Sequence, residues 1–162
     1  MEYLDDEKYI LLAYKEAQKA YKKLEAPIGA VIVKNNIVIA KAHNLREYKN
    51  NSLAHAEILC INKACKKLKS WRLDGCEMYV TLEPCPMCAG AIIQSRISKV
   101  YIGTKDLKNG AVGSVINLLE SNFTSKVQYE YANKEINDKC SLILKDFFKE
   151  LRNKNKVKYL NK

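Results

Sequence analysis

The stretch Pro84-Cys85-Pro86-Met87-Cys88 joins a predicted strand, Glu77 to Leu82, to an apolar segment with helical composition. Pro86 suits the first position of a helix, where its missing N–H costs nothing. Cys85 is therefore the expected N-cap of a helix that runs to about Ser95. Cys85 and Cys88 then point in the same direction from the first helical turn, where the positive end of the helix dipole favours thiolates.

A second fragment, His55-Ala56-Glu57, supplies an imidazole and a carboxylate. It begins a segment, Ala54 to Leu68, whose apolar residues recur at helical spacing. His55, Cys85 and Cys88 are ligands of the kinds that zinc prefers, and three of them leave the fourth position open. Structural zinc sites are normally closed by four protein ligands, whereas catalytic sites keep a place for water or substrate. The two fragments therefore predict a catalytic zinc site with Glu57 beside it.

The rest of the sequence alternates between helical and strand patterns. The additional expected elements are a helix at 5–24, a hairpin of strands 29–33 and 37–42, strands at 99–103 and 128–131, and a helix at 137–152. Loops are expected from His43 to Leu53 and from Gly103 to Ser114. The alternation implies a layered α/β fold in which at least part of the sheet is parallel.

The 162 residues suffice for one ordinary core, so we expect residues 1–162 to form a single domain with a basic C-terminal helix and tail at about 137–162. The first residues, Met1 to Asp6, carry acids where a secretory leader carries basic residues. No apolar run approaches the ~18 residues of a membrane span. We therefore expect a cytoplasmic protein that has no membrane partner.

The six cysteines favour metal binding over disulfides, because no secretory leader is recognised and two of them form the close pair Cys85 and Cys88. The others lie inside apolar patterns, where a free cysteine behaves as a small hydrophobic residue. We expect these four in the core: Cys60, Cys65, Cys76 and Cys140.

The formal net charge of +10 suggests a polyanionic partner. The excess is mostly Lys, and Asn and Ile are also abundant, as A/T-rich codon usage alone would produce. Position is better evidence than the total: from Lys145 to Lys162, basic residues are interleaved with Phe147, Phe148 and Tyr159. Such a segment suits RNA, whose phosphates and unstacked bases bind basic and aromatic side chains. The alternatives are core positions for the two phenylalanines and a frayed end for the last ten residues.

The predicted metal centre defines a reaction type. Zinc lowers the pKa of a bound water to about 7, which makes hydroxide available as a nucleophile at neutral pH. Glu57 can take the proton of that water and pass it to a leaving nitrogen. The order H-x-E followed by P-C-x-x-C is the motif of zinc-dependent nucleobase deaminases, in which hydroxide attacks the amine-bearing carbon and ammonia leaves.

Beyond this motif, the chain resembles the bacterial tRNA-specific adenosine deaminases, a branch of the cytidine and deoxycytidylate deaminase superfamily. The resemblance covers roughly residues 5 to 155 and is carried by residues 26–31, His43-Asn44, residues 54–58 and, above all, residues 81–113. One departure lies before Ala54, where the family usually has an Asp-Pro pair and this chain reads Asn50-Asn51-Ser52-Leu53. Without the proline we expect a less rigid loop.

The resemblance implies a three-layer α/β/α cytidine deaminase-like fold with a five-stranded mixed sheet, and a homodimer with one zinc ion per subunit. The implied activity is conversion of adenosine to inosine at the wobble position (34) of a tRNA, an arginine tRNA, whose anticodon stem-loop is the partner. The implied roles are zinc ligation by His55, Cys85 and Cys88, proton transfer by Glu57, contact with the flipped base by Asn44, and contact with flanking nucleotides by Lys105 and Asp106. From the basic tail, Phe147 and Phe148 join the candidate RNA contacts.

Four alternatives stay open. His43, the second of only two histidines, could close a structural zinc site, although that reading leaves Glu57 without a role. Asn44 could simply cap a turn. The same metal chemistry could serve free guanine or a pyrimidine nucleotide. Finally, the chain could be a zinc-stabilised RNA-binding module without turnover.

Overall fold

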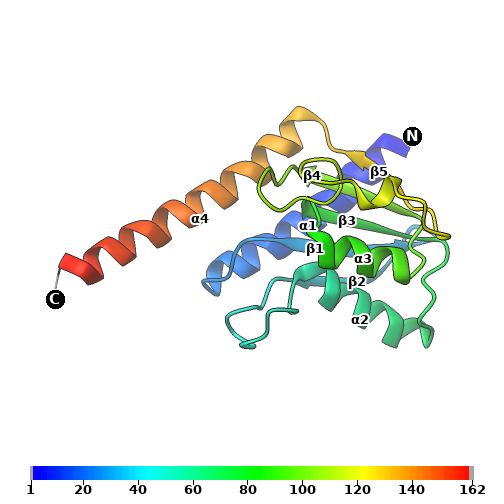
Figure 1. Ribbon diagram of the computed structural model, residues 1–162, viewed down its shortest axis with the longest axis horizontal. Helices are drawn as coiled ribbons and strands as arrows, with labels where there is room; N and C mark the ends of the chain where they lie inside the picture. The colour runs from blue at the N-terminus through cyan, green and yellow to red at the C-terminus, as the bar shows by residue number, and fades with distance from the viewer. Residues whose placement is uncertain (1, 161–162) are drawn as a thin grey trace.

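The structure, a computed structural model, describes residues 2–160, and the side chains of residues 5–160. A five-stranded sheet has the order β2-β1-β3-β4-β5 (Figure 1). The strands are β1 (Gly29–Lys34), β2 (Ile37–His43), β3 (Cys76–Leu82), β4 (Lys99–Thr104) and β5 (Gln128–Tyr131). The helices are α1 (Glu2–Lys22), α2 (Ala56–Leu68), α3 (Pro86–Gln94) and α4 (Lys134–Leu160), with a short 3-10 helix at Leu118–Glu120.

The sheet is mixed, as predicted. β1 pairs antiparallel with both β2 and β3, whereas β3, β4 and β5 run parallel. The predicted hairpin is confirmed: Asn35 and Asn36 adopt φ values of 50° and 60°, which two-residue hairpin turns require and Asn tolerates. The strands extend slightly beyond the predicted bounds, so His43 ends β2 and does not begin the following loop.

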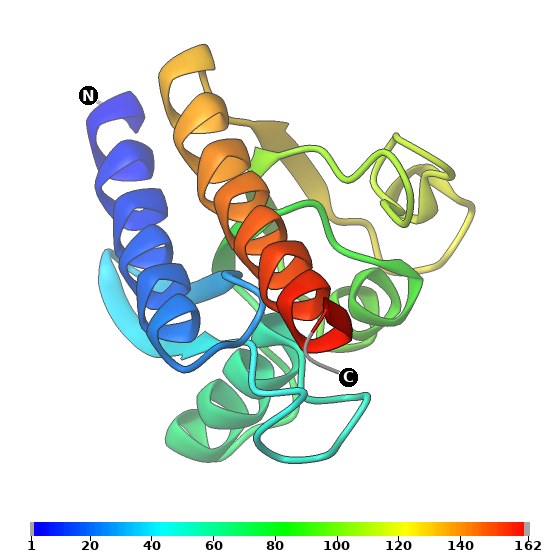
Figure 2. The same ribbon diagram turned by 90° about the vertical axis from the view of Figure 1, so that its left-hand side faces the viewer.

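Helices cover both faces of the sheet, which gives the three layers expected of the fold. Successive strand residues alternate between two apolar clusters: Ala30 and Ile32 pack with α2 and α3, while Val31 and Val33 pack with α1 and α4. α1 and α4 run side by side on their face of the sheet (Figure 2). The zinc motif fragments therefore both lie in the α2 and α3 layer.

The four cysteines outside the motif pack as expected. Cys60, Cys76 and Cys140 are fully buried, and Cys65 is half-buried against the same core. They act as small apolar side chains between the helices and the sheet.

The last helix is longer than the sequence pattern indicates. It begins at Lys134, because Asn133 Oδ1 accepts a hydrogen bond from the N–H of Ile136 (3.0 Å) and caps the helix. It continues to Leu160, well past the predicted end at Arg152, and projects from the body of the molecule (Figure 1). The apolar periodicity that predicted the helix stops where the helix leaves the core, since every side chain from Phe148 to Leu160 is exposed. The alternative of a frayed end for the last ten residues is therefore wrong as far as Leu160.

Within residues 2–160, the structure contains no helix that is both long and apolar enough to cross a membrane.

Close contact between α1 and β1 depends on Gly29. A Cβ atom at this position would lie 2.0 Å from the carbonyl oxygen of Ala13 and 2.7 Å from the nitrogen of Ala17.

Gly29→Ala should therefore force the backbones apart and lower the free energy of unfolding by about 3 kcal/mol. Gly90→Ala is the matched control, because no atom lies within 4 Å of its added Cβ and the residue is helical. It should be neutral or stabilising by about 0.5–1 kcal/mol. Urea unfolding checks both, and equal losses would contradict the contact.

Candidate metal centre and substrate cavity

Two helices begin at one point beside the sheet. Cys85 is the N-cap of α3 with Pro86 after it, as the sequence predicted. α2 begins at Ala56, two residues later than predicted, so His55 is its N-cap. Neither side chain makes a capping hydrogen bond to its own helix, so both are available to another partner. Cys88 is fully buried in the first turn of α3. The positive ends of two helix dipoles thus face one imidazole and two thiols.

The three donor atoms fit a tetrahedral metal site. His55 Nδ1 lies 3.7 Å from Cys85 Sγ and 3.5 Å from Cys88 Sγ, and all three ligand atoms lie within 4.8 Å of one another. Zinc bonds of usual length at tetrahedral angles place sulfur and nitrogen ligands about 3.6 Å apart. The predicted ligand set is therefore brought together with the spacing that three corners of a zinc tetrahedron require.

The two thiols differ in proton affinity. A hydrogen bond from Cys88, aided by His55, lowers the pKa of the Cys85 thiol to about 4 although burial raises it. The same contact with Cys85, together with burial, raises the pKa of Cys88. The pair therefore holds one proton between two sulfurs. A divalent cation would replace that proton and neutralise both thiolates.

Glu57 lies beside the three ligands without joining them. Its side chain is buried, it lines the same cavity as His55 and Cys85, and it lies outside the group of close ligand atoms. Burial raises the pKa of its carboxyl group, and hydrogen bonds only partly oppose that effect. A raised pKa brings a carboxylate closer to the range in which it can both accept and donate a proton near neutral pH.

His43 does not complete the metal site, so the structural-zinc alternative is wrong. Its Nδ1 lies 2.8 Å from Glu16 Oε2, and its Nε2 lies 3.1 Å from Lys23 Nζ. Among the residues that the structure describes, His55, Cys85 and Cys88 are the only group of three such ligands this close together.

A cavity of about 870 Å³ opens over the ligands, which is within the usual range for a small-molecule site. Its walls come from the turn before β1, the loop after β2, the starts of α2 and α3, the loop after β4, and one face of α4. The cations at the cavity are Arg46, Lys105, Lys108, Lys145 and Arg152. Glu83, after β3, and Asp106, in the loop after β4, accept hydrogen bonds from backbone N–H groups of that loop. The five cations outnumber the three acids at the cavity, Glu57, Glu83 and Asp106, which gives the cavity a cationic rim.

Most predicted substrate contacts line this cavity, namely Asn44, Lys105, Asp106 and Phe148. Asn44 also caps a turn, since its Oδ1 accepts from the N–H of Arg46 (3.2 Å). Phe147 lies apart from the cavity lining. It is buried between the rings of Tyr21 and Phe148, with ring centroids 5.6 Å and 5.3 Å away. For Phe147, the alternative of a core position is therefore correct, and the candidate RNA contact is not supported. Residues on one helix three or four apart share a face, and Phe148 but not Phe147 shares that of Lys145 and Arg152.

Glu83 anchors the loop after β4, a role that sequence analysis missed. Its carboxylate accepts hydrogen bonds from the N–H groups of Asp106, Val112 and Ser114 and from the Ser114 hydroxyl. Gly110 allows this arrangement, because a Cβ there would lie 2.1 Å from Glu83 Oε2. One buried carboxylate thus holds the segment that carries Lys105 and Asp106.

Glu25 anchors the loop before α2 in a similar way. Its carboxylate accepts from the N–H groups of Glu47 (3.2 Å) and Tyr48 (2.6 Å) and is itself buried. Asn51 Oδ1 accepts from the N–H of Leu53 farther along. The loop without the family's proline is therefore held by side-chain hydrogen bonds.

The fold and the site define the class of protein. A family model described as MafB19-like deaminase matches residues 4–152, which includes every element of the site. The protein is therefore a deaminase, and hence a hydrolase.

The relatives define the family within that class. The chain is 51% identical over 152 residues to a tRNA-specific adenosine deaminase of Bacillus subtilis (strain 168), covering 94% of each protein. It is 46% identical over 148 residues to a tRNA-specific adenosine deaminase of Aquifex aeolicus (strain VF5), covering 91% of this chain and 96% of the relative. The chain belongs to the family of tRNA-specific adenosine deaminases.

Solved structures agree with this assignment. One comes from work on A-to-I editing by tRNA:A34 deaminases at the wobble position of transfer RNA. It matches this chain with a TM-score of 0.75 and 40% sequence identity, and the match covers 77% of this chain and 97% of that one. A guanine deaminase from Bacillus subtilis has a TM-score of 0.60 and 31% identity, covering 73% of this chain and 86% of that one. The fold is therefore shared with an enzyme named for a different purine.

Replacing Glu83 should loosen the loop after β4. Glu83→Gln leaves one acceptor oxygen where the carboxylate has two, so some loop N–H groups lose their partner, and we expect a loss of about 2 kcal/mol at pH 7. Burial raises the pKa of Glu83, but the hydrogen bonds from Ser114, Val112 and Asp106 outweigh it and leave the pKa lowered. The wild-type advantage should therefore be full above about pH 4.5 and shrink as the pH falls through the lowered value.

Urea unfolding at several pH values measures this effect. Glu120→Gln is the control, because Glu120 is exposed and accepts one hydrogen bond, from the Tyr129 hydroxyl; it should change stability by less than about 0.5 kcal/mol. A Glu83→Gln loss that does not depend on pH between 7 and 3 would contradict the anchoring role of the charge.

Proposed function

We propose that this protein hydrolyses adenosine to inosine at the wobble position (34) of a tRNA, an arginine tRNA, using one zinc ion per subunit. The observation that carries the proposal is the cavity that joins His55, Cys85 and Glu57 to a rim of cations. A metal-assisted hydrolysis site enclosed by phosphate-binding side chains suits a nucleotide within a polyanion better than a free base.

His55, Cys85 and Cys88 would hold the zinc ion. When bound, zinc supplies a water of lowered pKa and leaves the protein to position the base and to move protons. Glu57, buried at the cavity floor, takes a proton at its carboxylate and donates it to the nitrogen that leaves as ammonia. Its raised pKa favours the second half of that transfer.

The cavity walls supply the groups that would hold an extruded nucleotide. Asn44 offers an amide at the cavity wall for the edge of the base, and Phe148 offers a ring for stacking. Arg46, Lys105 and Arg152 line the same cavity and would bind the phosphates on either side of the flipped residue. An anticodon loop suits such a site because its bases are already single-stranded, which lowers the cost of extrusion. The names of the relatives support the same substrate.

A second candidate is deamination of free guanine. It is favoured by the likeness to the Bacillus subtilis guanine deaminase, at 31% identity and a TM-score of 0.60. Against it stands the cationic rim, which a free base without phosphate does not need.

The proposed enzyme is a homodimer, as the family resemblance implies. The segment beside the cavity exposes Leu107, Val115 and Ile116 at 78%, 58% and 47%, and a second chain would cover such apolar groups. A particle mass of 18.5 kDa in solution, that of a single chain, would contradict this part of the proposal.

The decisive assay offers an arginine tRNA transcript with adenosine at position 34 and reads inosine by sequencing. The wild-type protein should convert it, and Glu57→Gln should lower the rate at least about a thousandfold while zinc content stays the same, because the amide cannot accept the proton. The control transcript carries guanosine at position 34. Ammonia release from free guanine without inosine formation in tRNA would move the protein to the second candidate.

Removing the metal distinguishes an enzyme from a zinc-stabilised RNA-binding module. We expect chelation to abolish deamination while the far-ultraviolet circular dichroism of the α/β core is largely kept, because the core packs without the ligands. Cys88→Ser should lose zinc by elemental analysis, and Cys65→Ser should keep it, since Cys65 lies outside the ligand group. Unfolding on chelation would favour the binding module.

A further inference from the structure

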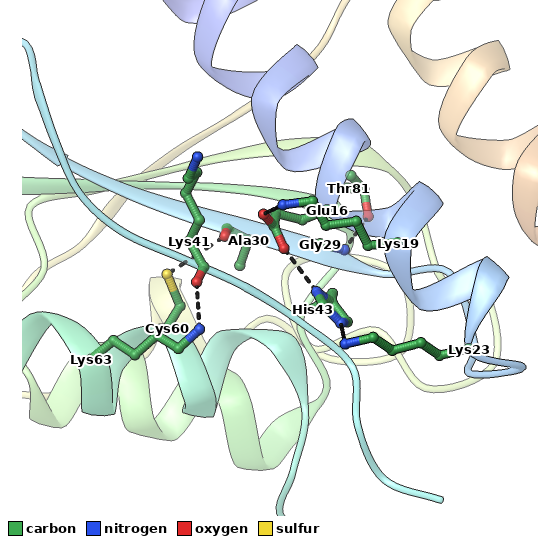
Figure 3. A network of polar contacts seen from close by, with 10 residues as sticks. All are labelled: Glu16, Lys19, Lys23, Gly29, Ala30, Lys41, His43, Cys60, Lys63 and Thr81. Carbon is green, nitrogen blue, oxygen red and sulfur yellow. Dashed lines mark hydrogen bonds and ion pairs between the residues drawn. The ribbon is translucent and has the colours of Figure 1, made fainter. Parts of the chain in front are cut away.

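A polar network outside the metal centre joins the end of α1 to the end of β2 (Figure 3). His43 Nδ1 lies 2.8 Å from Glu16 Oε2, and Glu16 Oε1 accepts from Lys19 Nζ at 2.7 Å. The ring contacts Lys23 Nζ through Nε2 at 3.1 Å. The side chains of His43 and Glu16 are only 12% and 6% exposed, so the contact between them is largely shielded from water.

The neighbours of the ring define its protonation pattern. An ammonium group has donors and no acceptor, so Lys23 donates to His43 Nε2, which must carry a lone pair. Nδ1 then bears the proton and donates to Glu16. The His43 ring is thus a bridge whose orientation is set from both sides.

The glycine that brings α1 against the sheet also makes this bridge possible. Gly29 is the register partner of His43 across β1 and β2, and a Cβ at Gly29 would lie 2.8 Å from the Glu16 Cβ. Glu16 therefore stands directly over the strand pair and reaches the histidine on the neighbouring strand, as Figure 3 shows.

The residue after His43 begins the cavity wall. The N–H of Asn44 donates to the carbonyl of Ile28 at 3.1 Å, which extends the ladder by one residue, and both residues line the cavity. Three residues on, Glu25 accepts from the N–H groups of Glu47 and Tyr48. The segment 43–48 is therefore held at both ends by buried carboxylates, one acting through His43.

We propose that His43 and Glu16 are positioning residues for the substrate site, which fix Asn44 at the cavity wall through the hydrogen bond between them. The inference rests on the proposed function for its kinetic consequence, since Asn44 orients the base there. A small misplacement of an orienting group costs turnover more than binding, because four of the five cations at the cavity, Lys105, Lys108, Lys145 and Arg152, lie outside the segment 43–48.

The kinetic test uses the tRNA assay with full-length, zinc-loaded enzyme. His43→Leu removes both ring contacts and should lower kcat ten- to a hundredfold with KM changed less than about twofold. His43→Asn keeps an N–H donor near the place of Nδ1 and should restore most of the lost rate. Glu16→Met removes the acceptor without shortening the side chain and should resemble His43→Leu. Lys19→Ala is the control, because it breaks only the ion pair with Glu16. The Lys19 side chain is 56% exposed.

A double-mutant cycle tests whether His43 acts through Asn44. If it does, His43→Leu should cost little further rate in an Asn44→Ala background. A loss of the same factor in both backgrounds would overturn the inference, and so would a His43→Asn rate as low as that of His43→Leu.

A measurement without substrate separates this inference from the proposed function. Hydrogen exchange of the Asn44 backbone N–H should be at least tenfold faster in His43→Leu and in Glu16→Met than in Lys19→Ala. Unchanged exchange in both variants would overturn the positioning role even if tRNA is deaminated. Accelerated exchange in an enzyme that forms no inosine would sustain the structural link while the proposed substrate fails.

Discussion

The structure depends on the burial of several acidic groups at one point. Cys88 and Glu57 are buried, and Cys85 is half-buried beside them. Burying like charges together is costly unless opposite charge is supplied. Here the N-terminal ends of α2 and α3 supply it, together with the imidazole of His55 and, in the proposed enzyme, a cation. This arrangement requires both helices to begin on the same face of the sheet, and α2 and α3 do pack in one layer over that face.

Buried carboxylates then hold the walls of the cavity. Glu83 holds the loop after β4, Glu25 holds the loop before α2, and Glu16 holds the end of β2 through His43. Each accepts charge-assisted hydrogen bonds, which contribute about 1.5–3 kcal/mol apiece, and each would be costly to leave unpaired. Loops at binding sites are usually less ordered than the elements they connect. In this protein they are fixed at specific atoms, so the positions of Asn44, Arg46 and Lys105 follow from the fold.

Local spacing predicted the part of the site that local chemistry governs. The spacing of Cys85 and Cys88, three positions apart with Pro86 between them, is sufficient to define an N-cap and a shared direction. The adjacent strands and the hairpin turn at Asn35 and Asn36 were predictable for the same reason. What could not be predicted depends on tertiary contact: Glu83 immediately precedes the motif, but its partners are 23 to 31 residues away. The length of α4 was missed because its last turns contact no core and so carry no apolar period.

The metal chemistry cannot by itself select the substrate. A guanine deaminase shares this fold at 31% identity, and a hydrolytic centre removes an amino group from either purine by the same steps. Discrimination must therefore reside in groups that contact the rest of the nucleotide. A cationic rim adds binding energy only for a substrate with phosphates on both sides of the reacting base, and it adds none for a free base. The amide of Asn44 can then select among bases that have already been drawn in. In the proposed enzyme, most of the cations that would supply affinity lie on α4 and the loop after β4, whereas the amide that would select the base follows the end of β2.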